Sequence, residues 1–285
     1  MDQQLKSWVH LSSHLLGDCF DLVMTRYQQC TSAFSTYLRF VAIQLNADCH
    51  FTGESALNLT SEQKLWDADI LVRAVTEGSL KLAYILNATP DERERLADEY
   101  WNVLPQFAEI KHSENATRLL ALVSDADALQ WQPLRDLLVP AERVNEIRKK
   151  HSKKNRNSLE ERWSFFGLCQ TFAAHENTGL RGIAGLAHGY SMNSHLLHKD
   201  AIGVGMVWER FTSAQPRRDA AILGHAARIV SDLWSMTKLR ASSMLLAAGI
   251  DPAEVVTIEQ RYSQLVSEIK QANADFNKAE YESET

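Results

Sequence analysis

The chain has 285 residues, which is long enough to bury one large core or two smaller ones. Its formal net charge of −6 excludes an overall attraction to nucleic acid or to an anionic membrane. A partner of that kind would have to be bound by a local group of basic residues.

The four cysteines (Cys19, Cys30, Cys49 and Cys169) lie far apart and form no CxxC or CxxH pair. This spacing is typical of reduced, buried thiols in a cytosolic protein. The N-terminal stretch MDQQLKSWVH lacks the basic start and the apolar run of a secretory signal. No window approaches the length of about 18 apolar residues that a membrane helix needs. We therefore expect a soluble, cytoplasmic protein without a membrane span.

Apolar residues recur at intervals of three and four along most of the chain. In chain order, the stretches that we expect to be helical are 7–29, 34–51, 60–86, 91–104, 115–123 and 129–139. The third begins with a capping-box pattern at Thr60 or Ser61, and the fourth follows Thr89-Pro90-Asp91. Only AIGVGMVWERF (201–211) has some strand character, and it is too isolated to build a sheet. The periodicity predicts an all-α fold, a multi-helix bundle.

The last part of the chain shows a heptad pattern after the helix start Asp251-Pro252-Ala253-Glu254. The apolar residues of this pattern are Val255, Ile258, Tyr262, Leu265, Ile269, Ala272 and Phe276. The pattern favours a long helix docked on the bundle, and it is also compatible with a homodimer contact through 255–276. We expect a single helical-bundle domain over 1–250, followed by a C-terminal long heptad helix and short tail over 251–285.

A basic run interrupts the acidic background. The stretch RVNEIRKKHSKKNR (143–156) carries seven Lys or Arg in fourteen residues. Such a run predicts either a solvated linker over 143–157 or an arm that contacts RNA phosphates. No aromatic residue is interleaved with the basic ones, which argues against base stacking. The residues that we expect to bind substrate here are Arg148, Lys149, Lys150, Lys153 and Lys154.

Side chains that could act in catalysis or bind a ligand are concentrated in the stretch GLRGIAGLAHGYSMNSHLLHKD (179–200). On a helix Tyr190, Ser194 and His198 step by four and share a face, with His195 beside them. His195 and His198, three residues apart, could chelate a metal, but no HExxH motif supplies further ligands and a base. We expect no metal and no other cofactor. A buried histidine with a structural role is the other interpretation of this cluster.

These residues carry a resemblance to a known family. The motifs Arg73-x3-Glu77 and Tyr190-x3-Ser194-x3-His198, with Tyr84 closing an apolar run, resemble the helical family called domain of unknown function 5677. The resemblance covers about 35–210 and leaves out the basic insert and the C-terminal helix. Its architecture is similar to HEPN bundles, many of which are dimeric, metal-independent ribonucleases or nucleotide-binding modules in phage defence and toxin systems.

The resemblance implies catalytic roles for five residues. Glu77 would orient the imidazole of His198, and Arg73 would hold a phosphate. His198 would act as general acid or base on a ribose hydroxyl or leaving oxygen. Tyr190 and Ser194 would position the substrate, with His195 as a further substrate contact. The alternative is that Arg73 and Glu77, four residues apart, form only an intrahelical ion pair.

HEPN nucleases usually carry an arginine followed, after four to six residues, by a histidine. Arg181 with His188 and Arg218 with His225 fit this spacing, as chance alone predicts for a chain with many Arg and His. Whether Arg73, Arg181 or Arg218 would serve therefore stays open at this point.

Three functions remain compatible with the sequence. The first is a HEPN-like, metal-independent ribonuclease or toxin effector of a defence system that uses His198 with Arg73 and Glu77. Such an effector could act alone or be held inactive by a partner protein of that system. The second is a non-catalytic helical module that binds a protein or a nucleotide, with the polar cluster as a structural element. The third is a metal-dependent hydrolase that uses His195 and His198.

Overall fold

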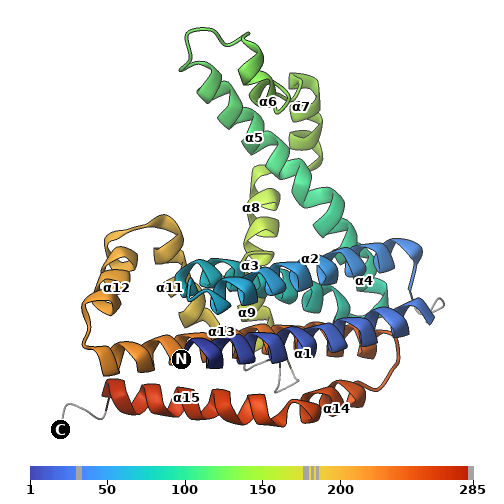
Figure 1. Cartoon of the computed structure of the whole chain (residues 1–285). Helices are drawn as coiled ribbons and strands as arrows, with labels where there is room; N and C mark the ends of the chain where they lie inside the picture. The colour runs from blue at the N-terminus through green and yellow to red at the C-terminus, as the bar shows by residue number, and fades with distance from the viewer. Residues whose placement is uncertain (30–33, 176–179, 181–182, 184–185, 282–285) are drawn as a thin grey trace. The chain divides into compact units, whose positions relative to one another are not determined.

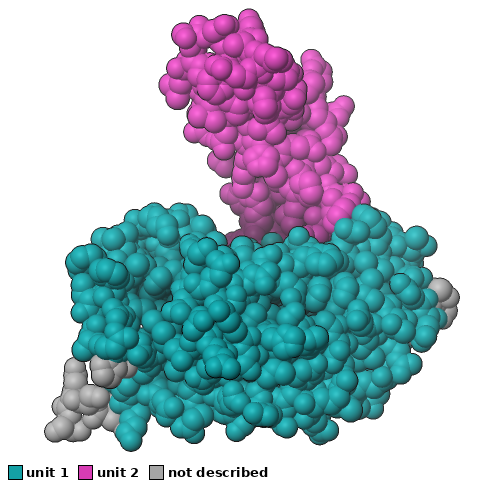
Figure 2. All heavy atoms as spheres, in the orientation of Figure 1, with its two compact units in different colours: residues 1–89, 169–285 teal, residues 90–168 magenta. Residues whose placement is uncertain are grey.

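A computed structural model describes residues 1–29, 34–175, 180, 183 and 186–281. Within these residues the chain is helical and contains no strand, which confirms the all-α prediction. The chain divides into two compact units (Figure 2). Unit 1 comprises Met1–Thr89 and Cys169–Thr285, and unit 2 comprises Pro90–Leu168.

Unit 1 is a bundle of long helices around α13 (Figure 1). Its main helices are α1 (Asp2–Gln29), α2 (Thr36–Ser61), α3 (Leu65–Leu86), α13 (Gln215–Ala247) and α15 (Ser263–Tyr281). Helix α13 contacts all four of the others, and its apolar face is buried. Each of these helices buries apolar residues at intervals of three and four, and this burial is the main source of the bundle's stability.

Two stretches differ from the sequence prediction in helix boundary or type. Thr60 and Ser61 end α2 and cap nothing, because the chain turns at Gln63, where φ is +60°, before α3 begins. The stretch 201–211 is the helix α12 (Ala201–Thr212), which follows α11 (Leu186–His198). Asp200 determines this, since its side chain accepts hydrogen bonds from the backbone N–H groups of Ile202 and Gly203.

The heptad stretch is two helices, α14 (Ala253–Arg261) and α15, separated at Tyr262. Its apolar seam lies inside unit 1: Val255, Ile258 and Leu265 are buried. Helix α15 packs on α13 and α1, and Trp8 Nε1 on α1 donates to Glu268 at 2.7 Å. The bundle itself therefore covers this seam, as the alternative of a long helix docked on the bundle predicts, and a homodimer through 255–276 stays a prediction that this packing does not support.

A buried arginine joins three helices in the core. Arg240 on α13 is 1% exposed and donates hydrogen bonds to the side chains of Asn46 on α2, Ser79 on α3 and Thr237. Burial lowers the pKa of the Arg240 guanidinium from its usual value. Since these three neutral acceptors surround the guanidinium, they compensate part of the cost of removing it from water.

Unit 2 has a small core of its own. Its helices are α4 (Pro90–Asp98), the π-helical turn η1 (Glu99–Val103), α5 (Leu104–Leu120), η2 (Leu129–Trp131), α6 (Gln132–Arg135), α7 (Ala141–Lys150) and α8 (Lys153–Arg162), and α9 (Phe165–Ala173) crosses into unit 1. Phe107 and Ile110 of α5 pack against Ile147 of α7.

The basic segment 143–157 is therefore not an extended linker but parts of two helices. Ile147 anchors α7 in the core of unit 2, and Ser152 caps α8 by accepting a hydrogen bond from Asn155 N. The basic residues at the end of α7 also suit the negative end of its dipole.

The cysteines that the structure describes are buried thiols. Cys19, Cys49 and Cys169 form no disulfide, and burial raises the pKa of each, that of Cys19 to about 12. Cys30 lies outside the described residues. No helix in the described part of the chain is long and apolar enough to cross a membrane.

Candidate functional site

Helices α3 and α11 pack together and bring three of the five predicted catalytic residues into contact. Arg73 Nη2 donates to the Tyr190 hydroxyl at 2.7 Å, and this hydroxyl donates to Glu77 Oε1 at 2.6 Å. Arg73 Nε also donates to Glu77 at 3.4 Å, and the guanidinium lies 4.1 Å from the centre of the Tyr190 ring. The intrahelical ion pair thus exists, and it binds a residue of the neighbouring helix as well.

The cluster of Arg73, Glu77 and Tyr190 extends to Lys81, whose Nζ lies 3.9 Å from Glu77 Oε2. Burial and the hydrogen bond to Glu77 raise the pKa of Tyr190 to about 12, so the phenol keeps its proton at neutral pH. The remaining nitrogen of the guanidinium, Arg73 Nη1, is buried and has no hydrogen-bond partner in the described chain. The geometry is that of a polar link between two helices.

The other residues of the predicted site do not join this cluster. Ser194 is half-buried and His198 is exposed, one and two turns further along α11. His195 Nδ1 lies 2.6 Å from Asp200 Oδ2, at the corner between α11 and α12. Across the residues that the structure describes, no three His, Cys, Asp or Glu side chains gather closely enough to hold a metal. The pair His195 and His198 therefore has no third ligand there.

The structure describes only one of the two arginine–histidine pairs that match the HEPN spacing. Arg181 lies outside the described residues, and the side chain of His188 is not described either. Arg218 hydrogen-bonds to the Gln215 side chain and to the Phe211 carbonyl, 3.5 Å away. His225, by contrast, lies in the wall of a cavity.

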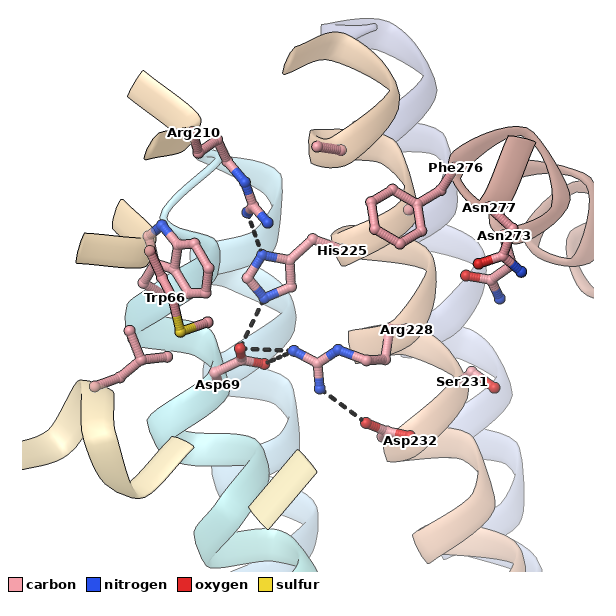
Figure 3. Close-up of a pocket in the computed structure, with 14 residues that line it drawn as sticks. Trp66, Asp69, Arg210, His225, Arg228, Ser231, Asp232, Asn273, Phe276 and Asn277 are labelled. Carbon is pink, nitrogen blue, oxygen red and sulfur yellow. Dashed lines mark hydrogen bonds and ion pairs between the residues drawn. The ribbon is translucent and has the colours of Figure 1, made fainter. Parts of the chain in front are cut away.

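This cavity has a volume of about 470 Å³ and belongs entirely to unit 1 (Figure 3). It is bounded by α3, α11, α12, α13 and α15. Its polar lining residues are Asp69, Arg210, His225, Arg228, Ser231, Asp232, Asn273 and Asn277, and its apolar ones include Trp66, Leu196, Met206 and Phe276. The size is within the range of about 300–1,000 Å³ that small-molecule sites have.

His225 is the central residue of the cavity. Its Nε2 lies 2.7 Å from Asp69 Oδ2, and its Nδ1 is in contact with the Arg210 guanidinium. A guanidinium can only donate, so Nδ1 accepts, and the single ring proton lies on Nε2 and is donated to Asp69. The imidazole is therefore neutral, in agreement with the lowered pKa that burial gives it.

Asp69 connects His225 to a second arginine. Arg228 Nη2 lies 2.6 Å from both carboxylate oxygens of Asp69, and Arg228 Nη1 lies 3.2 Å from Asp232 Oδ2. Burial by itself would raise the pKa of Asp69, but the hydrogen bond from His225 and the charge of Arg228 lower it overall. The Asp69 carboxylate is therefore ionised.

Asp232 is in the opposite situation. Burial and the neighbouring charge of Asp69 raise its pKa to about 6, against the effect of Arg228. The cavity thus holds a neutral imidazole with a lowered pKa and a carboxyl group with a raised one. Groups whose pKa values are moved in opposite directions in one site are typical of acid–base pairs.

No motif in the sequence indicates a site at Asp69, Arg210, Arg228 or Asp232, and His225 stands out only through a spacing that chance explains. A signal existed in the helical spacing, since His225, Arg228 and Asp232 step by three and four along α13. Asp69 likewise precedes Arg73 by four on α3. Nothing in the sequence indicates that these two faces meet.

The fold and the site define an all-helical protein with a buried aspartate–histidine pair, flanked by arginines, in a cavity. Comparisons with protein-family models, with curated proteins and with solved structures find no match for this chain. Membership of the domain of unknown function 5677 family therefore stays a prediction from the motifs quoted above.

Proposed function

We propose that the protein is a HEPN-like, metal-independent ribonuclease whose reaction takes place in the His225 cavity. The observation that carries this proposal is the Asp69–His225 pair, a neutral imidazole oriented by a buried carboxylate between two arginines. This arrangement suits a general base that acts on a phosphate ester.

In the proposed reaction, His225 is the general base and Asp232 is the general acid. The ribose 2′-hydroxyl attacks the adjacent phosphorus, and its proton passes to Nδ1 of His225, while Asp69 stabilises the imidazolium that forms. The P–O5′ bond then breaks, and the departing oxygen takes the proton of Asp232. The products are a 2′,3′-cyclic phosphate and a 5′-hydroxyl, so neither a metal nor a water molecule is consumed. Arg228 holds the side chains of Asp69 and Asp232 in place.

This proposal moves the base from His198 to His225. His198 is exposed at the end of α11, whereas His225 has the orienting carboxylate that the resemblance assigned to Glu77. Arg73, Glu77 and Tyr190 then act as the support that holds α11 on α3. Ser194 and His195 keep the role of substrate contacts, and His198 takes that role in place of acid–base catalysis.

The basic residues of unit 2 supply a surface for the RNA backbone. Lys149, Lys150, Lys153 and Lys154 are all exposed. None of these four lysines forms an ion pair with any residue that the structure describes. Arg148 is the exception on this surface, since it lies 3.1 Å from Glu114. Exposed lysines of this kind bind phosphates without sequence preference and in a salt-dependent way. A toxin or antiviral role, with a partner protein, is the setting that the resemblance implies for such an activity.

One observation favours a second candidate, a non-catalytic binding module. Both ring nitrogens of His225 already have partners, as have Arg73, Glu77 and Tyr190. Networks satisfied in this way also occur where polar residues only define the packing of a core.

Cleavage assays with matched variants separate the two candidates. Wild type, His225→Ala and His198→Ala would be incubated with total cellular RNA and with tRNA, with and without EDTA, and each would be checked for folding by its melting temperature. We expect chelator-resistant cleavage that His225→Ala abolishes and His198→Ala only weakens. If no RNA is cleaved by wild type, and His225→Ala is merely less stable, the protein is a binding module.

A further inference from the structure

Arg210 makes an unusual contact in the His225 cavity. Its guanidinium donates to Nδ1 of His225 and lies 4.2 Å from the centre of the Trp66 ring (Figure 3). The Trp66 and His225 rings also meet edge to face, with 4.6 Å between their centres. The N–H group at Nε2 of His225 donates to Asp69, so Nδ1 is the nitrogen that could accept a substrate proton. Arg210 covers this nitrogen.

The helix that carries Arg210 is anchored mainly at its beginning. At the corner before α12, Lys199 has a φ of +52°, and Asp200 caps the helix while it also binds His195. Gly203 lies so close to α11 that an added Cβ would be 2.4 Å from the His195 carbonyl oxygen. Past this corner, Met206 and Arg210 line the cavity.

The opposite face of α12 is exposed in the described part of the chain. Val204, Val207, Trp208 and Phe211 are large apolar residues on this face, and all four are exposed. The C-terminal half of α12 is thus held to unit 1 in part through Arg210 itself, so a small movement of this helix would carry the guanidinium away from His225.

We propose that Arg210 is the residue that binds the phosphoryl group of the ligand, and that this binding uncovers Nδ1 of His225. The inference deepens the proposed ribonuclease function, on which it rests, by naming a phosphate ester as the group that activates the base. In the exchange, an N–H···N contact to a neutral imidazole is replaced by N–H···O contacts to an anionic phosphate.

The charges in the cavity support this direction of exchange. A hydrogen bond between a guanidinium and a phosphate is assisted by both charges and can be bidentate, whereas one to a neutral ring nitrogen is not. The charged groups that face His225 are Asp69 from α3, Arg228 from α13 and Arg210 from α12. Arg228 holds both Asp69 and Asp232, whereas Arg210 is the arginine that contacts Nδ1 of His225 itself.

The test follows the His225 ring by NMR on the full chain, without RNA. The ring signal is assigned by its loss in His225→Gln. Two probes are titrated: inorganic phosphate, and a dinucleoside monophosphate whose 2′-hydroxyl is methylated so that it cannot be cleaved. The variants are Arg210→Ala and Arg210→Lys, with Arg217→Ala as the control, since Arg217 is exposed outside the cavity and its partner is Glu209, 3.3 Å away.

We expect saturable binding of the dinucleotide, with a change at Nδ1 and an increase in the pKa of His225 when it is bound. Arg210→Ala should weaken binding by about tenfold or more, Arg210→Lys by less, and Arg217→Ala should leave it unchanged. Binding of the dinucleotide but not of phosphate identifies the phosphodiester as the ligand, and binding of both identifies the phosphoryl group alone.

Unchanged affinity in Arg210→Ala, or binding that leaves Nδ1 of His225 unaltered, would overturn the proposal. So would an absence of binding by both probes. Cleavage of RNA is measured separately, so a protein that cleaves RNA while Arg210→Ala binds normally refutes this inference alone. A protein that shows the expected exchange at His225 but cleaves no RNA refutes the ribonuclease alone.

Discussion

Asp69 and Arg73 lie one turn apart on the same face of α3, and each holds a different helix to it. Asp69 receives hydrogen bonds from His225 and Arg228 of α13, and Arg73 reaches Tyr190 of α11. The predicted polar cluster and the cavity are therefore neighbours along a single helix. We therefore expect a substitution of Asp69 to shift Tyr190, and a substitution of Arg73 to shift His225 and Arg228.

Asp69→Asn tests the buried carboxylate. The substitution keeps the shape of the side chain but removes the charge that compensates Arg228 and fixes the tautomer of His225. We expect the free energy of unfolding to fall by about 3 kcal/mol, because a buried charge is left without its partner. Chemical denaturation measures this, with Asp67→Asn, exposed on the same helix, as the control. Equal effects of the two substitutions would show that the carboxylate is not needed.

Asp232 gives the stability a dependence on pH. Its pKa is raised from 3.8 to about 6, so the folded state holds the proton more tightly than the unfolded state. The stability that this contributes is complete below pH 3.8 and is lost as the pH rises through about 6. Asp232→Asn removes this dependence. The stability of the wild type relative to the variant should fall by about 3 kcal/mol between pH 4 and pH 7.5.

Unfolding curves of both proteins across this pH range make the comparison, with the exposed Asp275→Asn as the control. Parallel stability profiles for wild type and Asp232→Asn would contradict the raised pKa. They would also remove Asp232 from its proposed role as the acid.

Tyr190→Phe separates support from catalysis. The phenylalanine keeps the ring over Arg73 but loses the hydroxyl that joins Arg73 to Glu77. We expect a loss of about 2 kcal/mol in stability, since the hydrogen bonds lost are to charged groups, and RNA cleavage that is largely retained. Combining Tyr190→Phe with Glu77→Gln should cost less than the sum of the single changes, because they share one network. Loss of cleavage at unchanged stability would return the cluster to a catalytic role.

Arg240→Met tests the polar junction in the core. The substitution removes the donor that satisfies Asn46, Ser79 and Thr237, so it leaves buried acceptors without partners. We expect the free energy of unfolding to fall by about 3 kcal/mol. Arg261→Met is the matched control, because the Arg261 side chain is 58% exposed and pairs only at the surface with Asp18. A variant as stable as the wild type would mean that the acceptors find other partners.

The helices could be predicted from the sequence because the spacing of apolar residues is a local property. The all-α prediction rests on this spacing. The link between Arg73, Glu77 and Tyr190 could also be predicted, since the resemblance placed these residues in one site. The His225 cavity could not be predicted from the sequence, because Asp69 and His225 are 156 positions apart and meet only when α3 packs on α13. The heptad pattern left two alternatives open for a related reason: a periodic apolar face has the same sequence pattern whether it packs on another molecule or on the chain's own bundle.

Leu265→Ala tests whether the heptad seam packs within unit 1. Leu265 is buried within unit 1, so removing three carbons leaves a cavity that should lower the free energy of unfolding by about 3 kcal/mol. Because the seam serves the bundle itself, the molar mass in solution should be the same for variant and wild type, as measured by light scattering. Val256→Ala, on the exposed side of α14, should change neither quantity. A wild-type dimer that Leu265→Ala converts into an equally stable monomer would instead place the seam between two copies of the chain.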